Sequence, residues 1–133
     1  MPLTKKRMNN ERGQTMVEFA LVLPVLVVLV LAIAQFGVAF NNYLALTDAA
    51  RAAARKGAVS RQDPSPAGAC QSAGYAAGTD LKNPGTDFLL SCSSPWSLGS
   101  TVTVTASYPY SVSLLGWVVS SGRMTTRMQE RVE

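Results

Sequence analysis

The sequence of 133 residues has no histidine, only two cysteines and only 15% charged residues, where a soluble domain usually has about 25%. Without histidine, the commonest general base is missing. The sequence also has no nucleotide-binding glycine motif and no GxSxG nucleophile motif. Asp63, Asp80 and Asp87 fall in loop sequence, where aspartate commonly serves turns. These absences indicate a protein that is not an enzyme and that holds no cofactor and no metal.

The shortage of charge is local, because no residue from Phe19 to Thr47 is charged. Residues 1–13 hold four basic side chains and one acidic side chain, a balance of +3 out of a net +4. No basic stripe with interleaved aromatic residues follows, so the sequence does not indicate nucleic-acid binding. A basic tip before an apolar run is typical of a cytoplasmic membrane anchor. Basic residues also follow the run, so Lys5–Arg7 and the two cysteines decide the predicted orientation.

The apolar run from Phe19 to Phe40 is long enough to cross a membrane. It is interrupted only by Pro24, Gln35 and Gly37. As a helix it would extend about 33 Å, against about 30 Å for the hydrocarbon core of a bilayer. It is also longer than the apolar core of an ordinary signal peptide. Pro24 removes one helical hydrogen bond, so we read it either as a kink or as a tolerated membrane proline.

The helix is predicted to continue beyond the membrane through "NNYLALTDAARAAARKGAV", which is rich in strong helix formers. Small apolar residues recur there at spacings of three and four residues, which predicts a narrow face for close packing. This face consists of Leu46, Ala49, Ala50, Ala53 and Ala54. Gly57 is a plausible end. The sequence thus predicts a leader of residues 1–13 without regular structure, a helix over residues 14–57 and a module over residues 58–133.

The predicted module is small and mixes loops, strands and one short helix. Residues 69–77 suggest a short helix, and "DFLLSCS" and "STVTVTASYPY" suggest strands. "SVSLLGWVVSSG" reads as a loop or a short helix. "RMTTRMQERV" alternates as a strand does, although its residue types also suit a helix. The fold class is therefore α+β, with a long N-terminal transmembrane helix followed by a small antiparallel β-containing exported module.

Cys70 and Cys92 are 22 positions apart and show no metal-binding spacing. A disulfide is the expected use if this region lies outside the cytoplasm, and it would help a small module to fold. The alternative is a pair of unrelated buried thiols.

Glu18 is the one carboxylate beside the apolar run. A charge at the centre of a bilayer costs from about 2.5 kcal/mol upward, but Glu18 lies at the predicted cytoplasmic end of the transmembrane helix. It could simply favour the start of the helix through the helix dipole. A second interpretation comes from its register with Gly13. If the chain is cut after Gly13, Gln14 becomes the N-terminus and Glu18 the fifth residue.

A basic leader ending in glycine, followed by a fifth-position glutamate, phenylalanine and an apolar helix, resembles the class III signal of type IV prepilins. "GQTMVEFALVLP" more narrowly resembles TadE-like proteins of the tight-adherence (Flp, type IVb) pilus systems. The likeness continues through "AQFGVAFNNYLALTDAARAAARKGAV" and into "VTVTASYPY".

The resemblance implies a minor pilin or pseudopilin that takes part in assembling a pilus for surface adhesion. A prepilin peptidase would cut between Gly13 and Gln14, and Glu18 would then neutralise the terminal amine of a neighbouring subunit. The implied partners are that peptidase, other pilin or pseudopilin subunits, an inner-membrane assembly platform and the lipid bilayer. The implied location is the bacterial inner membrane, with the N-terminus cytoplasmic and the module periplasmic or exoplasmic, or within an extracellular pilus.

Two other classes of protein compete with this reading. The first is a plain single-pass anchor with an exported domain that never joins a filament. The second is an exported binding module whose loops carry an adhesin-like surface. Cleavage after Gly13 and a requirement for Glu18 would distinguish the pilin reading from the first, and a bound ligand would favour the second.

Overall fold

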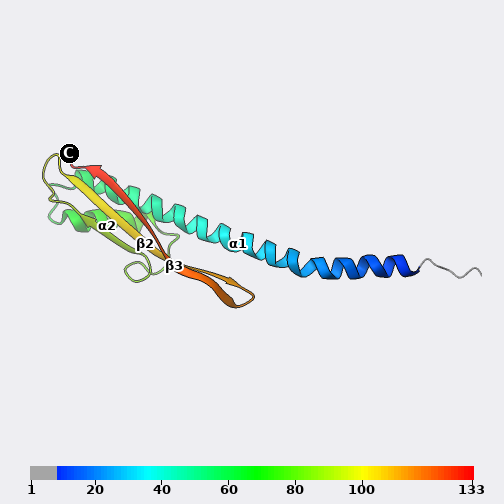
Figure 1. The fold of residues 1–133 in the computed structure, drawn as a ribbon. Coiled ribbons are helices and arrows are strands. Elements are labelled where there is room, and N and C mark those ends of the chain that lie inside the picture. Colours follow the sequence, from blue (N-terminus) through cyan, green and yellow to red (C-terminus); the bar gives the residue numbers. More distant parts are fainter. Residues whose placement is uncertain (1–8) are drawn as a thin grey trace, which may run out of the picture.

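The computed structural model describes residues 9–133, with side chains from residue 13 onward. It contains two helices and three strands among these residues. In chain order they are α1 (Asn9–Val59), α2 (Pro66–Ala77), β1 (Leu89–Ser93), β2 (Thr101–Leu114) and β3 (Trp117–Arg131). Helix α1 projects as a long rod from a small module formed by its own C-terminal end, α2 and the sheet (Figure 1). The predicted α+β fold, with a long N-terminal helix and an antiparallel sheet, is confirmed.

Helix α1 extends beyond both predicted ends. It begins at Asn9, inside the predicted leader, and the predicted basic anchor residues Lys5–Arg7 lie outside the described residues. At the other end the helix continues through Gly57 to Val59, so the prediction that Gly57 ends it is wrong. A Cβ at Gly57 would lie 3.0 Å from Val102 Cγ1 and 3.3 Å from Cys70 Sγ. The role of Gly57 is therefore to let α1 pack closely against Val102 and Cys70, and it does not end the helix.

The three strands form one antiparallel sheet in the order β1-β2-β3. The predicted alternation of β2 is confirmed, because Val102, Val104 and Ala106 are buried whereas Thr101 on the opposite face is exposed. The predicted strand at the C-terminal end is also confirmed, as part of β3.

The reading of residues 111–122 as a loop or a short helix is wrong, because β2 and β3 continue through them as a hairpin. Leu115 and Gly116 turn the chain with φ of 52° and 85°. Positive φ at both central residues is the pattern of a two-residue turn that matches the twist of the strands. Leucine in place of the usual asparagine or aspartate hides this turn in the sequence.

The core lies where the C-terminal part of α1 meets α2 and one face of the sheet. The five residues of the predicted small-residue face of α1 are all buried, at 1% exposure or less. Opposite them lie Phe88, Leu90, Val102 and Val104. The predicted short helix is confirmed as α2. The predicted disulfide between Cys70 and Cys92 is also confirmed, and it joins α2 to β1.

Candidate functional site

The N-terminal half of α1 lies apart from the rest of the protein. Every large apolar side chain from Phe19 to Phe40 is exposed, from 38% at Val28 to 73% at Phe36. Monomeric soluble proteins rarely expose so large an apolar surface. In the part of the chain that the structure describes, α1 is the one helix long and apolar enough to cross a membrane. This is compatible with a membrane anchor.

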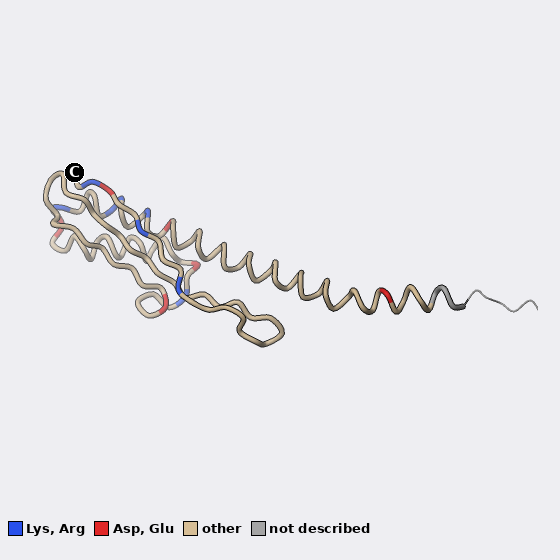
Figure 2. Tube along the Cα trace, viewed as in Figure 1, with Lys and Arg blue, Asp and Glu red and all other residues tan. Residues whose placement is uncertain are grey.

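Charge is also absent along this part of α1. Figure 2 shows the middle of the helix as a long stretch without Lys, Arg, Asp or Glu, whereas charged residues gather on the module. The first charged residue after Glu18 is Asp48, 30 positions further. At 1.5 Å per residue the two carboxylates are about 45 Å apart along the helix axis. Glu18 is therefore electrically isolated from the module.

Gly13, Gln14, Val17 and Glu18 line one shallow surface near the start of α1. The Gln14 side-chain amide donates a hydrogen bond from Nε2 to Glu18 Oε1 at 3.4 Å. Among the side chains that the structure describes, no cation pairs with Glu18. A Cβ at Gly13 would have no neighbour within 4 Å. The predicted processing residues and the predicted assembly carboxylate thus share an open surface, one helical turn apart.

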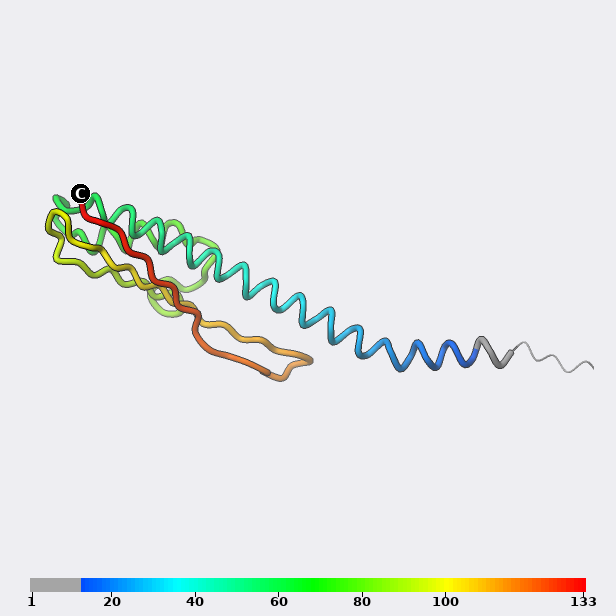
Figure 3. Tube along the Cα trace, turned by 45° about the horizontal axis from the view of Figure 1, so that its top comes forward, coloured from blue at the N-terminus to red at the C-terminus, as the bar shows by residue number. Residues whose placement is uncertain are grey.

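Pro24 lies inside a continuous helix. Helix α1 changes direction within its blue N-terminal part (Figures 1 and 3). A proline in a helix interior removes one backbone hydrogen bond and so favours a bend. Assignment of that bend to Pro24 itself stays a prediction.

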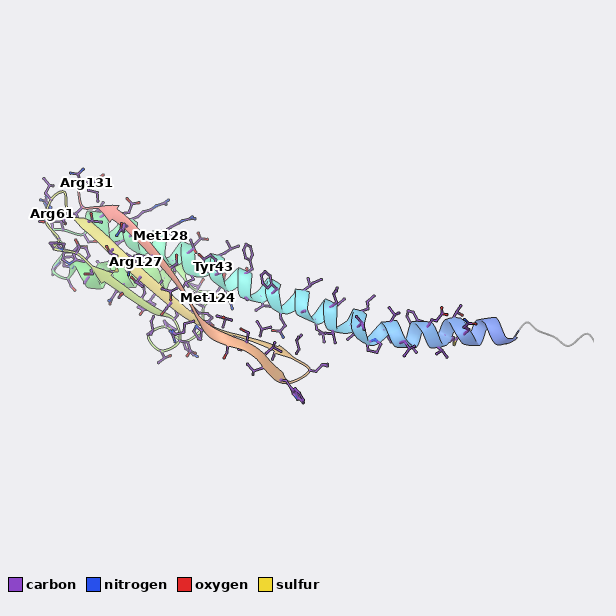
Figure 4. All side chains as sticks on the ribbon, in the orientation of Figure 1. Tyr43, Arg61, Met124, Arg127, Met128 and Arg131 are labelled. Atoms are coloured by element: carbon purple, nitrogen blue, oxygen red, sulfur yellow. A yellow bond between two sulfur atoms is a disulfide. The ribbon has the colours of Figure 1, made fainter. Side chains whose placement is uncertain are left out.

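The sequence reading missed a groove between α1 and the β2–β3 hairpin. It has a volume of about 480 Å³ and is lined on the α1 side by Phe36, Ala39, Phe40 and Tyr43. The hairpin side consists of Tyr110, Val112, Ser120 and Met124. Figure 4 shows Tyr43 of α1 near Met124 of β3. The apolar residues of "SVSLLGWVVSSG" are the sequence signal for this groove, and they point to it only when residues 111–122 are recognised as strands.

The described residues contain no group of three side chains suited to a metal ion.

A known family model matches part of the chain. Residues 13–55 match the family model described as TadE-like protein, which confirms the resemblance over about a third of the chain. The matched residues all lie in α1, so the sheet and α2 lie outside the match. No curated protein and no solved structure matches the chain. The family match and the apolar N-terminal helix fit a protein associated with a tight-adherence pilus.

Proposed function

We propose that this TadE-like chain is a minor pilin or pseudopilin that takes part in assembling a tight-adherence pilus for surface adhesion. The observation that carries the proposal is an apolar helix whose large side chains from Phe19 to Phe40 are exposed, with one carboxylate near its start and a folded module at its other end. The role is structural rather than catalytic. Its partners are other pilin or pseudopilin subunits, the inner-membrane assembly platform and a prepilin peptidase.

Processing would remove the basic leader by cutting between Gly13 and Gln14. Both residues are exposed, and a side chain at Gly13 would meet no other atoms. A glycine inside a helix costs roughly 1 kcal/mol relative to alanine, because it loses more backbone freedom. Gly13 is therefore a weak point at which the helix can open to expose the peptide bond to a peptidase.

The cut would give Gln14 a positively charged amine. In an assembly of parallel helices, Glu18 of one subunit would meet this amine of a neighbour. Both groups would be poorly solvated there, and pairing would offset part of the desolvation cost. After the cut, the next charged side chain along the helix is Asp48, 30 positions from Glu18. We therefore expect one axial register to bring Glu18 opposite the amine of the neighbour. The carboxylate would thus set the stagger between subunits.

The proposed orientation places the leader in the cytoplasm and the module on the other side of the inner membrane. The basic residues of the leader favour the cytoplasmic side. The disulfide between Cys70 and Cys92 suits an oxidising compartment.

Mass spectrometry of the N-terminus of protein purified from native membranes tests processing. We expect a mature chain that starts at Gln14. A chain that still begins at Met1, or that begins well beyond Phe40, would contradict the proposal and favour the plain membrane anchor.

Substitution of Glu18 tests assembly, with co-purification of pilus components and surface piliation as readouts. Glu18→Ala and Glu18→Gln should insert into the membrane and be processed, yet fail to assemble, because the amine of the neighbour loses its counter-charge. An unpaired buried charge typically costs about 3–5 kcal/mol. Glu18→Asp should be partly impaired, since its side chain is shorter.

Val17→Ala is the matched control, because Val17 lines the same surface and carries no charge. It should assemble normally. If Glu18→Ala assembles as well as the parent chain, Glu18 is only an interfacial helix-start residue, and the plain anchor becomes the better description.

A further inference from the structure

The β2–β3 hairpin ends in an apolar tip that nothing in the described part of the chain covers. We define the hairpin tip as residues 114–119, two strand ends around the Leu115–Gly116 turn. Its outermost side chains are strongly exposed: Leu115 at 75%, Trp117 at 81%, Val118 at 64% and Val119 at 64%. So many exposed apolar side chains in one place indicate a contact surface.

The hairpin runs back beside α1, toward the N-terminal half of that helix (Figures 1 and 3). The residues that line the groove show how far along α1 the hairpin extends. Val112 and Ser120, which pair across the hairpin, line the groove together with Phe36 and Phe40 of α1. The hairpin tip lies beyond that pair by a few residues, or about 7–10 Å at 3.3 Å per residue. It is thus placed alongside the apolar part of α1 rather than beside the charged module.

The charges of the hairpin are confined to its base. No residue from Tyr110 to Gly122 is charged, and Figure 2 shows the end of the hairpin without any Lys, Arg, Asp or Glu. Arg123 is the first charged residue after the turn, and it donates hydrogen bonds to the Asp87 carbonyl and to Ser107 Oγ. Tyr43 and Tyr110 line the groove between the hairpin tip and the charged module. Tyrosine and tryptophan are enriched where a membrane meets water.

We propose that the hairpin tip inserts into the outer interface of the lipid bilayer beside α1 and forms a second membrane contact. The proposal rests on the membrane span of the proposed function. The insertion is shallow, of the order of 5–10 Å, as for other interfacial apolar segments. Deeper insertion is excluded because a two-stranded ribbon has unpaired backbone groups on its outer edges, which hydrocarbon does not tolerate. This contact would fix the orientation of the module at the membrane surface.

Tryptophan quenching tests the proposal, because the chain has only two tryptophans. Trp96→Phe leaves Trp117 in the hairpin tip, and Trp117→Phe leaves Trp96, which is partly buried against the core. Each full-length variant is reconstituted into phosphatidylethanolamine and phosphatidylglycerol vesicles whose acyl chains carry bromine. We expect Trp117 to lose most of its emission and Trp96 to keep its emission.

Val118→Asp in the Trp96→Phe background should restore the emission of Trp117, because a charge lifts the hairpin tip out of the interface. Leu98→Asp is the matched control. Leu98 is also strongly exposed, at 69%, but it lies in the β1–β2 connection beside the C-terminus, away from the hairpin tip. It should leave the quenching of Trp117 unchanged.

Resistance to alkaline carbonate extraction reports separately whether α1 spans the bilayer. An unquenched Trp117 in protein that resists extraction would overturn the second contact and leave the proposed function intact. Protein released by carbonate would overturn both. If Trp117 is shielded only at high protein-to-lipid ratio and bromine does not quench it, a second copy of the chain covers the hairpin tip, and the lipid contact is wrong.

Discussion

The two halves of α1 belong to one continuous helix but have opposite surroundings. The bare half, residues 13–40, has no buried side chain. In the packed half, residues 46–59, one stripe is buried against α2 and the sheet. From Phe19 to Phe40 the bare half is apolar on all sides apart from Gln35 and has mostly large side chains, whereas the packed half is apolar on one stripe of mostly small side chains. A helix that is apolar all round requires an apolar environment on all sides.

The difference shows how side-chain size divides the tasks of one helix. Alanine on the packed half lets α2 and β2 approach closely, and a folded module results. Leucine, valine and phenylalanine on the bare half offer a large apolar surface, and the module meets it only at the groove beside Phe36 and Phe40. Stability of the module should therefore depend on the packed half, and membrane insertion and assembly should depend on the bare half.

The same substitution in each half should have very different effects. Leu46→Ala removes a fully buried side chain and should lower the free energy of unfolding by about 2–5 kcal/mol. Leu26→Ala removes a side chain that is 54% exposed in the bare half, and it should change that free energy by less than about 0.5 kcal/mol. Urea unfolding in detergent of full-length chains that also carry Trp117→Phe, followed by the fluorescence of Trp96, measures both. Equal losses would contradict the division of the helix.

The disulfide should stabilise the module and leave the bare half unaffected. Cys70 and Cys92 close a loop with a sequence separation of 22, so their replacement by alanine should cost about 3 kcal/mol. The same urea experiment measures the loss, and circular dichroism should show that the helical signal of α1 persists after the module unfolds. A reductant should destabilise the parent chain but not the double variant. A parent chain insensitive to full reduction would exclude a stabilising role.

Much of this comparison could be predicted from the sequence, because local patterns carry it. The uncharged apolar run marks the bare half, and the spacing of Leu46, Ala49 and Ala53 marks the packed half. The alternation of β2 gave its buried face correctly. The disulfide was predicted from the expected location outside the cytoplasm and from the small size of the module, not from any local sequence pattern.

Two features could not be predicted, for physical reasons. The extent of the β2–β3 hairpin was hidden because both faces of its tip are exposed, so its apolar residues do not alternate. Gly57 looked like a helix end, but its role depends on contact with Cys70 and Val102, which are distant in sequence. The role of Glu18 depends on a second chain, so a single sequence supports only a hypothesis.

Two glycines on helices should respond to alanine in different ways. A Cβ at Gly74 would overlap Leu90 Cδ1 and lie 3.0 Å from the Ala53 side chain of the packed half. Gly74→Ala should therefore destabilise the module by about 1–3 kcal/mol. A Cβ at Gly37, in the bare half, would meet nothing within 4 Å. Gly37→Ala should leave unfolding of the module unchanged, and a loss there would show that the bare half contributes to the module.

The smallest effect is expected at Asp48, the first charged residue after the bare half. Asp48 Oδ1 lies 3.4 Å from Arg51 Nη1, one turn further along α1, and the two side chains are 69% and 58% exposed. Exposed ion pairs contribute little to the free energy of unfolding, because water screens the attraction and ordering two flexible side chains costs entropy. Asp48→Asn should change the free energy of unfolding by less than about 0.5 kcal/mol, and the small loss that salt causes in the parent chain by screening this pair should be absent in the variant. Asp48→Leu sharpens the comparison, because it would extend the uncharged stretch of α1 to Ala50 while leaving the buried stripe intact. It should leave urea unfolding nearly unchanged. A loss above about 1 kcal/mol for Asp48→Asn would show that the boundary between the two halves is held by charge rather than by side-chain size.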